Sequence, residues 1–344
     1  MDSVPMWLNA VLFLIAAVII WASGTRLEKL AATLAERTGL GEAFTGMLLL
    51  AAATSLPELA TTVTAVVILK NPTLAVHNLL GGVALQTLII AIADLVQRRR
   101  GALTSFDPRV SLLTQGVGLI LLLQVAIAGI AAKGVPVVFA TSGWLVLVLL
   151  AYLGTVFLVQ RSRKPRWKPT FEDERAPEPP AAPPRDGRST LQLWVSFAGL
   201  SLLVLAGGVV ATQTAEGLAA QTGLGDAFIG ATLLAMATSL PEVSTTVSAA
   251  RNGRFTAAIS NVFGSNAFDV TLLLLADLLH RETSVLAHAG STALFTATIG
   301  SAMTCIYVWG MIERDDRTVL RLGWDSVAAT LVYGVGMTVL YFIQ

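Results

Sequence analysis

The sequence predicts an all-α, polytopic membrane protein in which ten transmembrane helices form two inverted five-helix repeats. Three observations lead to this fold class: low charge, ten long apolar stretches, and a motif that returns an odd number of spans later. Of the 344 residues, 54% are hydrophobic and 13% are charged, whereas a soluble domain is roughly 25% charged. The net charge of +1 gives no indication of a nucleic-acid partner, and no segment indicates a protein partner.

Each of the ten apolar stretches exceeds the roughly 17 residues that a helix needs to cross the hydrocarbon layer. The first stretch has no basic residues before it, so we interpret it as a span and not as a cleaved signal peptide. The predicted spans cover residues 7–24, 43–69, 73–96, 110–132, 135–160, 191–215, 227–250, 256–279, 286–312 and 322–343.

The orientation of the spans follows from the basic residues between them. Of the 23 Lys and Arg residues, 20 fall in the loops after spans 1, 3, 5, 7 and 9. The opposite side holds only Lys70, Lys133 and Arg281. Because loops rich in Lys and Arg stay in the cytoplasm, we expect a multi-pass protein of the cell membrane with both termini outside.

The chain divides into two halves, residues 1–160 and 191–344, joined by a linker. The linker, residues 161–190, is rich in proline and charge, so it cannot bury enough apolar area to offset its ordering entropy. We interpret it as a largely disordered cytoplasmic segment. A second interpretation is a lipid-binding segment, because residues 161–168 form a basic cluster beside the membrane.

An internal repeat relates the two halves. The segment "GLGEAFTGMLLLAAATSLPELATTVTA" from Gly39 returns as "GLGDAFIGATLLAMATSLPEVSTTVSA" from Gly223, with 19 of 27 positions identical. The repeats extend over about residues 39–97 and 223–280. Since the second copy lies five spans after the first, the two copies cross the membrane in opposite directions. Inverted repeats of this kind are typical of secondary transporters, whose ion site lies where the repeats meet.

Each repeat places a proline and a glutamate near the middle of an apolar span, as Pro57 with Glu58 and as Pro241 with Glu242. A proline leaves the carbonyl four residues earlier without its donor. In the first repeat, the carbonyls of Ala51 to Ala53, the hydroxyls of Thr54 and Ser55, and Glu58 supply hard oxygen ligands of the kind that suit calcium. Residues 51, 54, 55 and 58 also share one helix face.

Asp269 is a third acid at mid-membrane depth, and Ser265 lies four residues before it on the same face. An intramembrane carboxylate is a functional residue by default, whereas an intramembrane hydroxyl more often serves helix packing. Asp94 and Asp277 lie at span ends, where we expect structural roles, with Asp94 paired to Arg98. The three histidines, His77, His280 and His288, also lie near span ends and are expected to pack or face the interface.

The paired "TSLPE" motifs, each followed by a glycine-containing segment on the next span, resemble the two alpha-repeats of the sodium/calcium exchanger group of the calcium/cation antiporter superfamily. The resemblance covers both halves and implies exchange of sodium for calcium by alternating access, without enzymatic activity or a cofactor. It implies that the metal ligands are Ala51, Thr54, Ser55, Glu58 and Gln86 in the first repeat and Ala235, Thr238, Ser239, Glu242, Ser265 and Asp269 in the second.

The first repeat departs from the family pattern at two positions. Gly82 stands where the family has a serine, and Gln86 stands where it has an asparagine or aspartate. The divalent site is therefore expected to be intact, whereas the family's usual three-sodium stoichiometry is not expected to hold. A proton-coupled calcium or divalent cation antiporter remains the nearest alternative, because a buried acid can carry a proton. A cation channel is the alternative from a different class.

Overall fold

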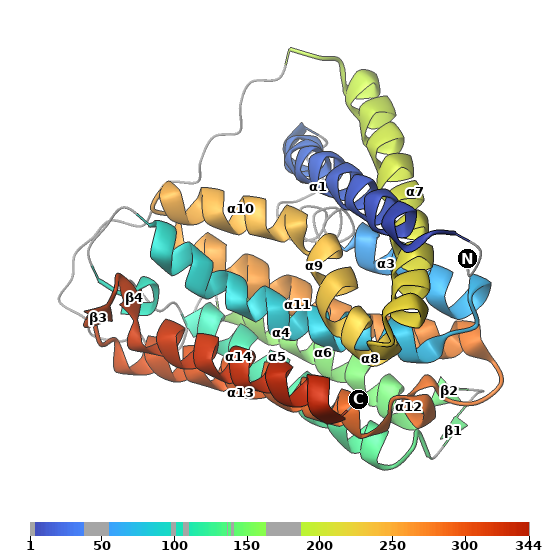
Figure 1. The fold of residues 1–344 in the computed structure, drawn as a ribbon. Coiled ribbons are helices and arrows are strands. Elements are labelled where there is room, and N and C mark those ends of the chain that lie inside the picture. Colours follow the sequence, from blue (N-terminus) through green and yellow to red (C-terminus); the bar gives the residue numbers. More distant parts are fainter. Residues whose placement is uncertain are drawn as a thin grey trace.

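The computed structural model describes residues 4–37, 55–97, 101–105, 110–135, 137–138, 141–162 and 187–343. These residues form a helical bundle with two small hairpins (Figure 1), which confirms the predicted fold class. The predicted ligands Ala51 and Thr54, together with Arg98 and most of the linker 161–190, lie outside the described residues.

The described part of the first half contains five α-helices, one π-helix, one 3-10 helix and a two-stranded hairpin. In chain order these elements are α1 (Met6–Arg37), α3 (Leu56–Val63), the π-helix η2 (Thr64–Ile68), α4 (Pro72–Val96), the 3-10 helix η3 (Leu103–Ser105), α5 (Val110–Ala131), β1 (Val137–Val138), β2 (Thr141–Ser142) and α6 (Gly143–Arg161).

The second half repeats this order, with a longer described segment before its proline. Its elements are α7 (Thr190–Thr222), α8 (Gly225–Ile229), the π-helix η4 (Gly230–Leu234), α9 (Ala235–Thr238), α10 (Leu240–Arg251), α11 (Phe255–His280), α12 (Val285–His288), α13 (Gly290–Glu313), β3 (Thr318–Val319), β4 (Leu322–Gly323) and α14 (Trp324–Ile343).

The described helices account for all ten predicted spans, one of them in part. Eight helices are long and apolar enough to cross a membrane. A ninth crossing consists of Gly225–Thr238 and Leu240–Arg251, which bend by 53° where they meet. The proline therefore breaks the helix at Ser239. The shorter apolar segment Leu56–Ile68 is the described part of the predicted span 43–69.

The two hairpins were not predicted. The span predicted at 135–160 begins as a helix only at Gly143, because the apolar residues before it pair as β1 with β2. The equivalent hairpin, β3 with β4, precedes α14 in the second half. An apolar run alone could not distinguish a strand before the span from the span itself.

The two halves interlock instead of standing side by side. Helix α1 crosses α10 of the other half at Gly24, where an added Cβ would lie 2.6 Å from Pro241 Cγ. Helix α7 crosses α3 of the first half at Gly208, where an added Cβ would lie 2.5 Å from Ala60 Cβ. Gly24 and Gly208 are separated by the same 184 positions as Pro57 and Pro241. The internal repeat of the sequence therefore corresponds to a pair of equivalent helix crossings in the structure.

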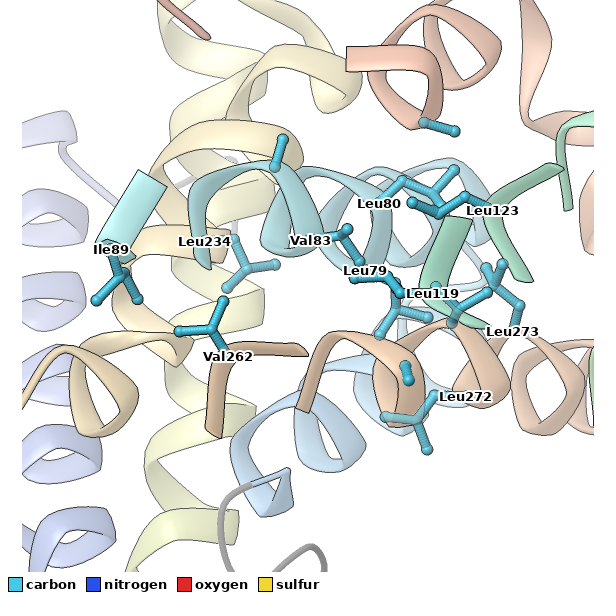
Figure 2. Close-up of a cluster of buried hydrophobic side chains, with 14 of the residues drawn as sticks. Leu79, Leu80, Val83, Ile89, Leu119, Leu123, Leu234, Val262, Leu272 and Leu273 are labelled. Atoms are coloured by element: carbon cyan, nitrogen blue, oxygen red, sulfur yellow. The ribbon is translucent and has the colours of Figure 1, made fainter. Parts of the chain in front are cut away.

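The core lies around α4, the most deeply enclosed of the unbroken spans, of which 72% is buried. Figure 2 shows Leu79, Leu80 and Val83 of α4 among leucines of α5 and α11. Burial of each such side chain stabilises the fold by roughly 1.5–3 kcal/mol in water, but less within a bilayer, where lipid is equally apolar. The enclosed α4 and α11 form the frame that carries the site residues.

Two buried carboxylates fasten the hairpins to this frame. Asp94 at the end of α4 accepts hydrogen bonds from Leu103 N at 2.8 Å and from Gly323 N of β4 at 2.7 Å. Asp277 near the end of α11 accepts from Val285 N at 2.7 Å and from Ser142 N of β2 at 2.7 Å. Each carboxylate therefore joins its own repeat to the hairpin of the other half. The predicted structural role is confirmed, with backbone partners.

The loops divide between two ends of the bundle. In Figure 1 both chain termini and the β1–β2 hairpin lie toward one end, and the β3–β4 hairpin lies at the other. Arg321 donates to Gln97 O at 3.2 Å, so the loops after α4 and α13 meet. At the opposite end, Gln221 donates to Val4 O at 2.6 Å. These loops lie at alternate ends of the bundle along the chain, which is the pattern that the distribution of Lys and Arg residues predicts.

We predict that the end carrying the β3–β4 hairpin faces the cytoplasm. In a background with Cys305→Ala, a membrane-impermeant thiol reagent added to intact cells should label Lys133→Cys. The same reagent should label Gly187→Cys only after the membrane is permeabilised. Labelling of Gly187→Cys from outside would reverse the topology.

Asp94→Asn should lower the stability of the protein, because the amide retains one acceptor oxygen where the carboxylate serves two backbone N–H groups. Hydrogen bonds to a charged group contribute about 1.5–3 kcal/mol each. Thermal unfolding in detergent should show a lower midpoint for Asp94→Asn and for Asp277→Asn. The control is Asp315→Asn, which removes a surface ion pair with the exposed Arg317 and should unfold like the parent. Unchanged midpoints for both buried variants would contradict the proposed fastening.

Candidate functional site

The candidate site centres on the first turns of α3 and α10, the helices that carry the two repeated prolines. Glu58 stands in the first turn of α3 and Glu242 in the first turn of α10, each directly after a proline. Glu58 is 2% exposed and Glu242 is 1% exposed. Since the first turn of a helix carries unpaired N–H groups and positive potential, the chain folds so that each carboxylate sits at the favourable end of its helix.

Among the residues that the structure describes, neither carboxylate has a geometric hydrogen-bond partner. All four carboxylate oxygens of Glu58 and Glu242 are buried and unpaired there, and so is Oδ1 of Asp269. The hydroxyls of Ser55 and Ser239 are buried and unpaired as well. Buried polar atoms are almost always satisfied in folded proteins. A cluster of unpaired oxygens therefore indicates a place built for a group that the protein itself does not supply.

The three acids also repel one another. The charges of Glu242 and Asp269 act on Glu58, and the charge of Asp269 acts on Glu242. An isolated buried charge costs several kcal/mol unless it is compensated. A cation between the carboxylates would offset the repulsion between them and would also be the partner that their oxygens lack. Carboxylate and hydroxyl oxygens are hard ligands, which match calcium and sodium better than they match softer metals.

A matching pair of hydrogen-bonded brackets supports the two glutamates. Asn78 of α4 donates to Thr61 Oγ1 at 2.9 Å, and Thr61 donates to the backbone carbonyl of Glu58 at 3.0 Å. In the second repeat, Asn261 donates to Thr245 Oγ1 and Thr245 donates to the backbone carbonyl of Glu242, both at 3.2 Å. These brackets hold each first turn against the next span of its own repeat.

Gln86 and Ser265 belong to a network instead of presenting free ligands. Gln86 donates through Nε2 to Asp269 Oδ2 at 3.1 Å and accepts at Oε1 from Ser265 Oγ at 3.0 Å. The amide thus crosses from the first repeat to the second and occupies one oxygen of Asp269. Beside it, an added Cβ at Gly82 would meet nothing within 4 Å, so this departure from the family pattern leaves open space.

The structure brings most of the predicted ligands together. Thr238 lies close to the carboxylate of Glu58, and Ser55 lies close to Asp269. The Ala235 carbonyl accepts from Ser239 N at 3.0 Å, so it is engaged within its helix. Within the described ranges, no three Asp, Glu, His or Cys side chains form a compact metal cluster. Hydroxyl and carbonyl oxygens would have to complete the shell of an ion held by the glutamates.

Several residues of the site were not singled out from the sequence as site residues. Thr61 and Thr245 are identical residues at equivalent positions of the two repeats. That identity is the feature of the sequence from which they could have been predicted. His77, expected to pack or to face the interface near a span end, is fully buried and joins Thr73 O at 2.8 Å to Thr292 Oγ1 at 2.9 Å. Its role is therefore packing of α4 against α13.

A bundle of inverted repeats that meet at buried, unpaired carboxylates defines a membrane ion transporter. The family model described as "Sodium/calcium exchanger protein" matches residues 8–167 and 191–344. The chain belongs to this family.

Two curated relatives are similar to the chain in sequence, and one solved structure is similar to it in fold. It is 28% identical over 271 residues to the inner membrane protein YrbG of Escherichia coli K12, covering 78% of this chain and 79% of that one. It is 35% identical over 121 residues to the sodium/calcium exchanger MaX1 of Methanosarcina acetivorans, covering 35% and 33%. The fold matches the H+/Ca2+ exchanger CAX with a TM-score of 0.65 at 14% identity, over 97% of this chain and 85% of that one.

Glu58→Gln and Glu242→Gln should each abolish calcium binding while the protein stays folded. At about 100 times the dissociation constant, a bound ion stabilises the parent by about 2.7 kcal/mol. Thermal unfolding in detergent should therefore show a calcium-induced rise in the parent that both variants lose. Without calcium, each variant should be at least as stable as the parent, because one of two repelling charges is gone.

The matched control is Glu282→Gln, which neutralises an exposed glutamate outside the site and should keep the calcium-induced rise. If either site variant bound or transported calcium like the parent, the central site would lie elsewhere.

Proposed function

We propose that the chain is a secondary active antiporter that exchanges sodium for calcium across the cell membrane by alternating access. The observation that carries this proposal is the pair of buried glutamates whose four carboxylate oxygens have no hydrogen-bond partner in the described part of the chain. Calcium is the cargo that best fits this pair, since it takes six to eight oxygen ligands and tolerates irregular geometry. The sequence likeness to MaX1, described as a sodium/calcium exchanger, supports sodium as the coupling ion.

The monovalent part of the cycle centres on Asp269. Oδ1 of this acid is unpaired, whereas Oδ2 accepts from Gln86. The equivalent position in the first repeat holds the neutral Gln86 itself, and Gly82 provides no hydroxyl. The chain therefore offers a charged monovalent site in the second repeat alone. We infer that fewer than the family's usual three sodium ions accompany each calcium ion.

Proton coupling is the second candidate, and the burial of Asp269 favours it. Removal from water disfavours the charged form of a carboxyl group, so a proton can take the place of a monovalent cation on this acid. The fold is shared with the H+/Ca2+ exchanger CAX, but at this identity the likeness concerns the fold alone. A cation channel is disfavoured because one chain contains both halves of the site, whereas channels more often assemble pores from identical subunits.

The reversal potential of exchange in proteoliposomes separates these candidates. We expect the parent to reverse at a potential that corresponds to fewer than three sodium ions per calcium ion, or to shift with pH if protons replace sodium. Asp269→Asn should alter this ion dependence more than any change at Gly82 alters calcium affinity. A three-to-one reversal that is insensitive to pH would contradict the reduced stoichiometry.

Gly82→Ser tests the asymmetry directly, because the open space beside Gly82 accepts the added hydroxymethyl group. We expect it to lower the sodium concentration for half-maximal exchange by severalfold, with calcium affinity nearly unchanged. Gly264→Ser is a suitable control, since it adds the same group into space that is also free within 4 Å, one residue from the ligand position. A variant at Gly82 that behaves like the parent would show that the missing hydroxyl does not limit sodium binding.

A further inference from the structure

The helix crossings of the two halves differ in a residue beside the crossing glycines. Gly24 and Gly208 occupy equivalent positions, and the residues one helical turn after them are equivalent as well. In α1 this residue is Glu28, and in α7 it is Thr212. The two helices therefore carry a carboxylate at one crossing and a hydroxyl at the other.

The surroundings of Glu28 are those of an additional cation ligand. Its carboxylate lies against the hydroxyl of Thr245, and its Oε2 is buried without a hydrogen-bond partner. Thr245 Oγ1 accepts from Asn261. Its single hydroxyl hydrogen can be donated to the Glu28 carboxylate or to the carbonyl of Pro241 or Glu242, but to only one of them at a time. Oε2 of Glu28 therefore remains open to a cation beside the Thr245 hydroxyl.

Glu28 acts electrostatically on the central site. Its charge acts on Glu242, whose own oxygens are buried and unpaired. Thr245 follows Glu242 by three residues, a shift of about 4.5 Å along the helix axis, in the direction of Arg251. The basic side chain that acts on Glu28 is Lys29, which is exposed and therefore screened by water.

An open groove follows the outer turns of α10. It has a volume of about 400 Å³ and is lined by Ser244, Val247, Ser248, Arg251 and Asn252, the last three of which are exposed. Its lining is polar apart from Val247. The groove borders the half of α10 that leads toward the end of the bundle predicted to be cytoplasmic.

The equivalent position in the other half has no such ligand. Thr212 is fully buried, and its hydroxyl donates back to Gly208 O at 2.7 Å. Its charge-free side chain offers a passing cation little on the outer side of the site. The difference between Glu28 and Thr212 is thus a difference between the two access routes.

We propose that Glu28, with Thr245, forms a transit site that binds the transported divalent cation on the cytoplasmic side of Glu242. The inference rests on the proposed function, because it assumes that the central glutamates carry that ion. It makes calcium binding from the two faces unequal: a carboxylate assists the ion from inside and is absent from the route outside.

The test compares the two faces of the same full-length protein. Everted membrane vesicles expose the cytoplasmic face to added radioactive calcium, and right-side-out vesicles expose the outer face. Glu28→Gln should raise the half-saturating calcium concentration about tenfold in everted vesicles, which corresponds to about 1.4 kcal/mol of lost binding. In right-side-out vesicles the value should equal that of the parent.

Two further variants keep the result interpretable. Glu28→Thr, which installs the residue of the other half, should reproduce the one-sided rise if Glu28→Gln fails to fold. Thr212→Val is the matched control at the equivalent position and should leave the cytoplasmic value unchanged. A rise of equal size on both faces, or no rise on either, would overturn the transit site.

The outcomes also separate this inference from the function on which it rests. A parent that carries calcium while Glu28→Gln is indistinguishable from it overturns the transit site alone. A parent that carries no calcium in either type of vesicle overturns the proposed function, and the transit site with it.

Discussion

The fold is organised around two like charges that it buries without neutralising. Glu58 and Glu242 would leave such a position if the surrounding helices could relax, because water would solvate them better than the protein interior does. The interior helices α4 and α11, the asparagine–threonine brackets and the first-turn positions of both glutamates all prevent that relaxation. Under the proposed function, a cation bound between the two carboxylates would offset the cost of burying them.

The internal repeat accounts for most of this arrangement, and a few positions depart from it. The brackets of Thr61 and Thr245 are near copies, and the carboxylates of Asp94 and Asp277 hold equivalent loops at opposite ends of the bundle. The exceptions are Gly82, Gln86 and Glu28, each of which lacks a chemical equal in the other half. An exchanger with two identical halves would treat its two faces alike, and under the proposed function these residues are where the two faces would differ.

Much of the fold and part of the site could be predicted from the sequence. The ten spans, the inverted repeat and the central glutamates follow from apolar length, identity between segments and the cost of a charge in lipid. The hairpins before α6 and α14 could not be predicted, because a two-residue strand has no pattern of its own. Glu28 was not recognised either, since it lies near the end of an apolar run among basic residues. Only the crossing at Gly24 brings it to the site.

The interlocking of the halves also bears on how such a chain could have arisen. Since α1 packs on the broken span of the second half and α7 on that of the first, neither half contains a finished site. A single ancestral half could have worked only by pairing with an oppositely inserted copy of itself, and a membrane would have had to accept it in both directions. Joining the copies through a basic linker removes that requirement. Each half is then free to diverge, and the protein can acquire an inside and an outside that differ.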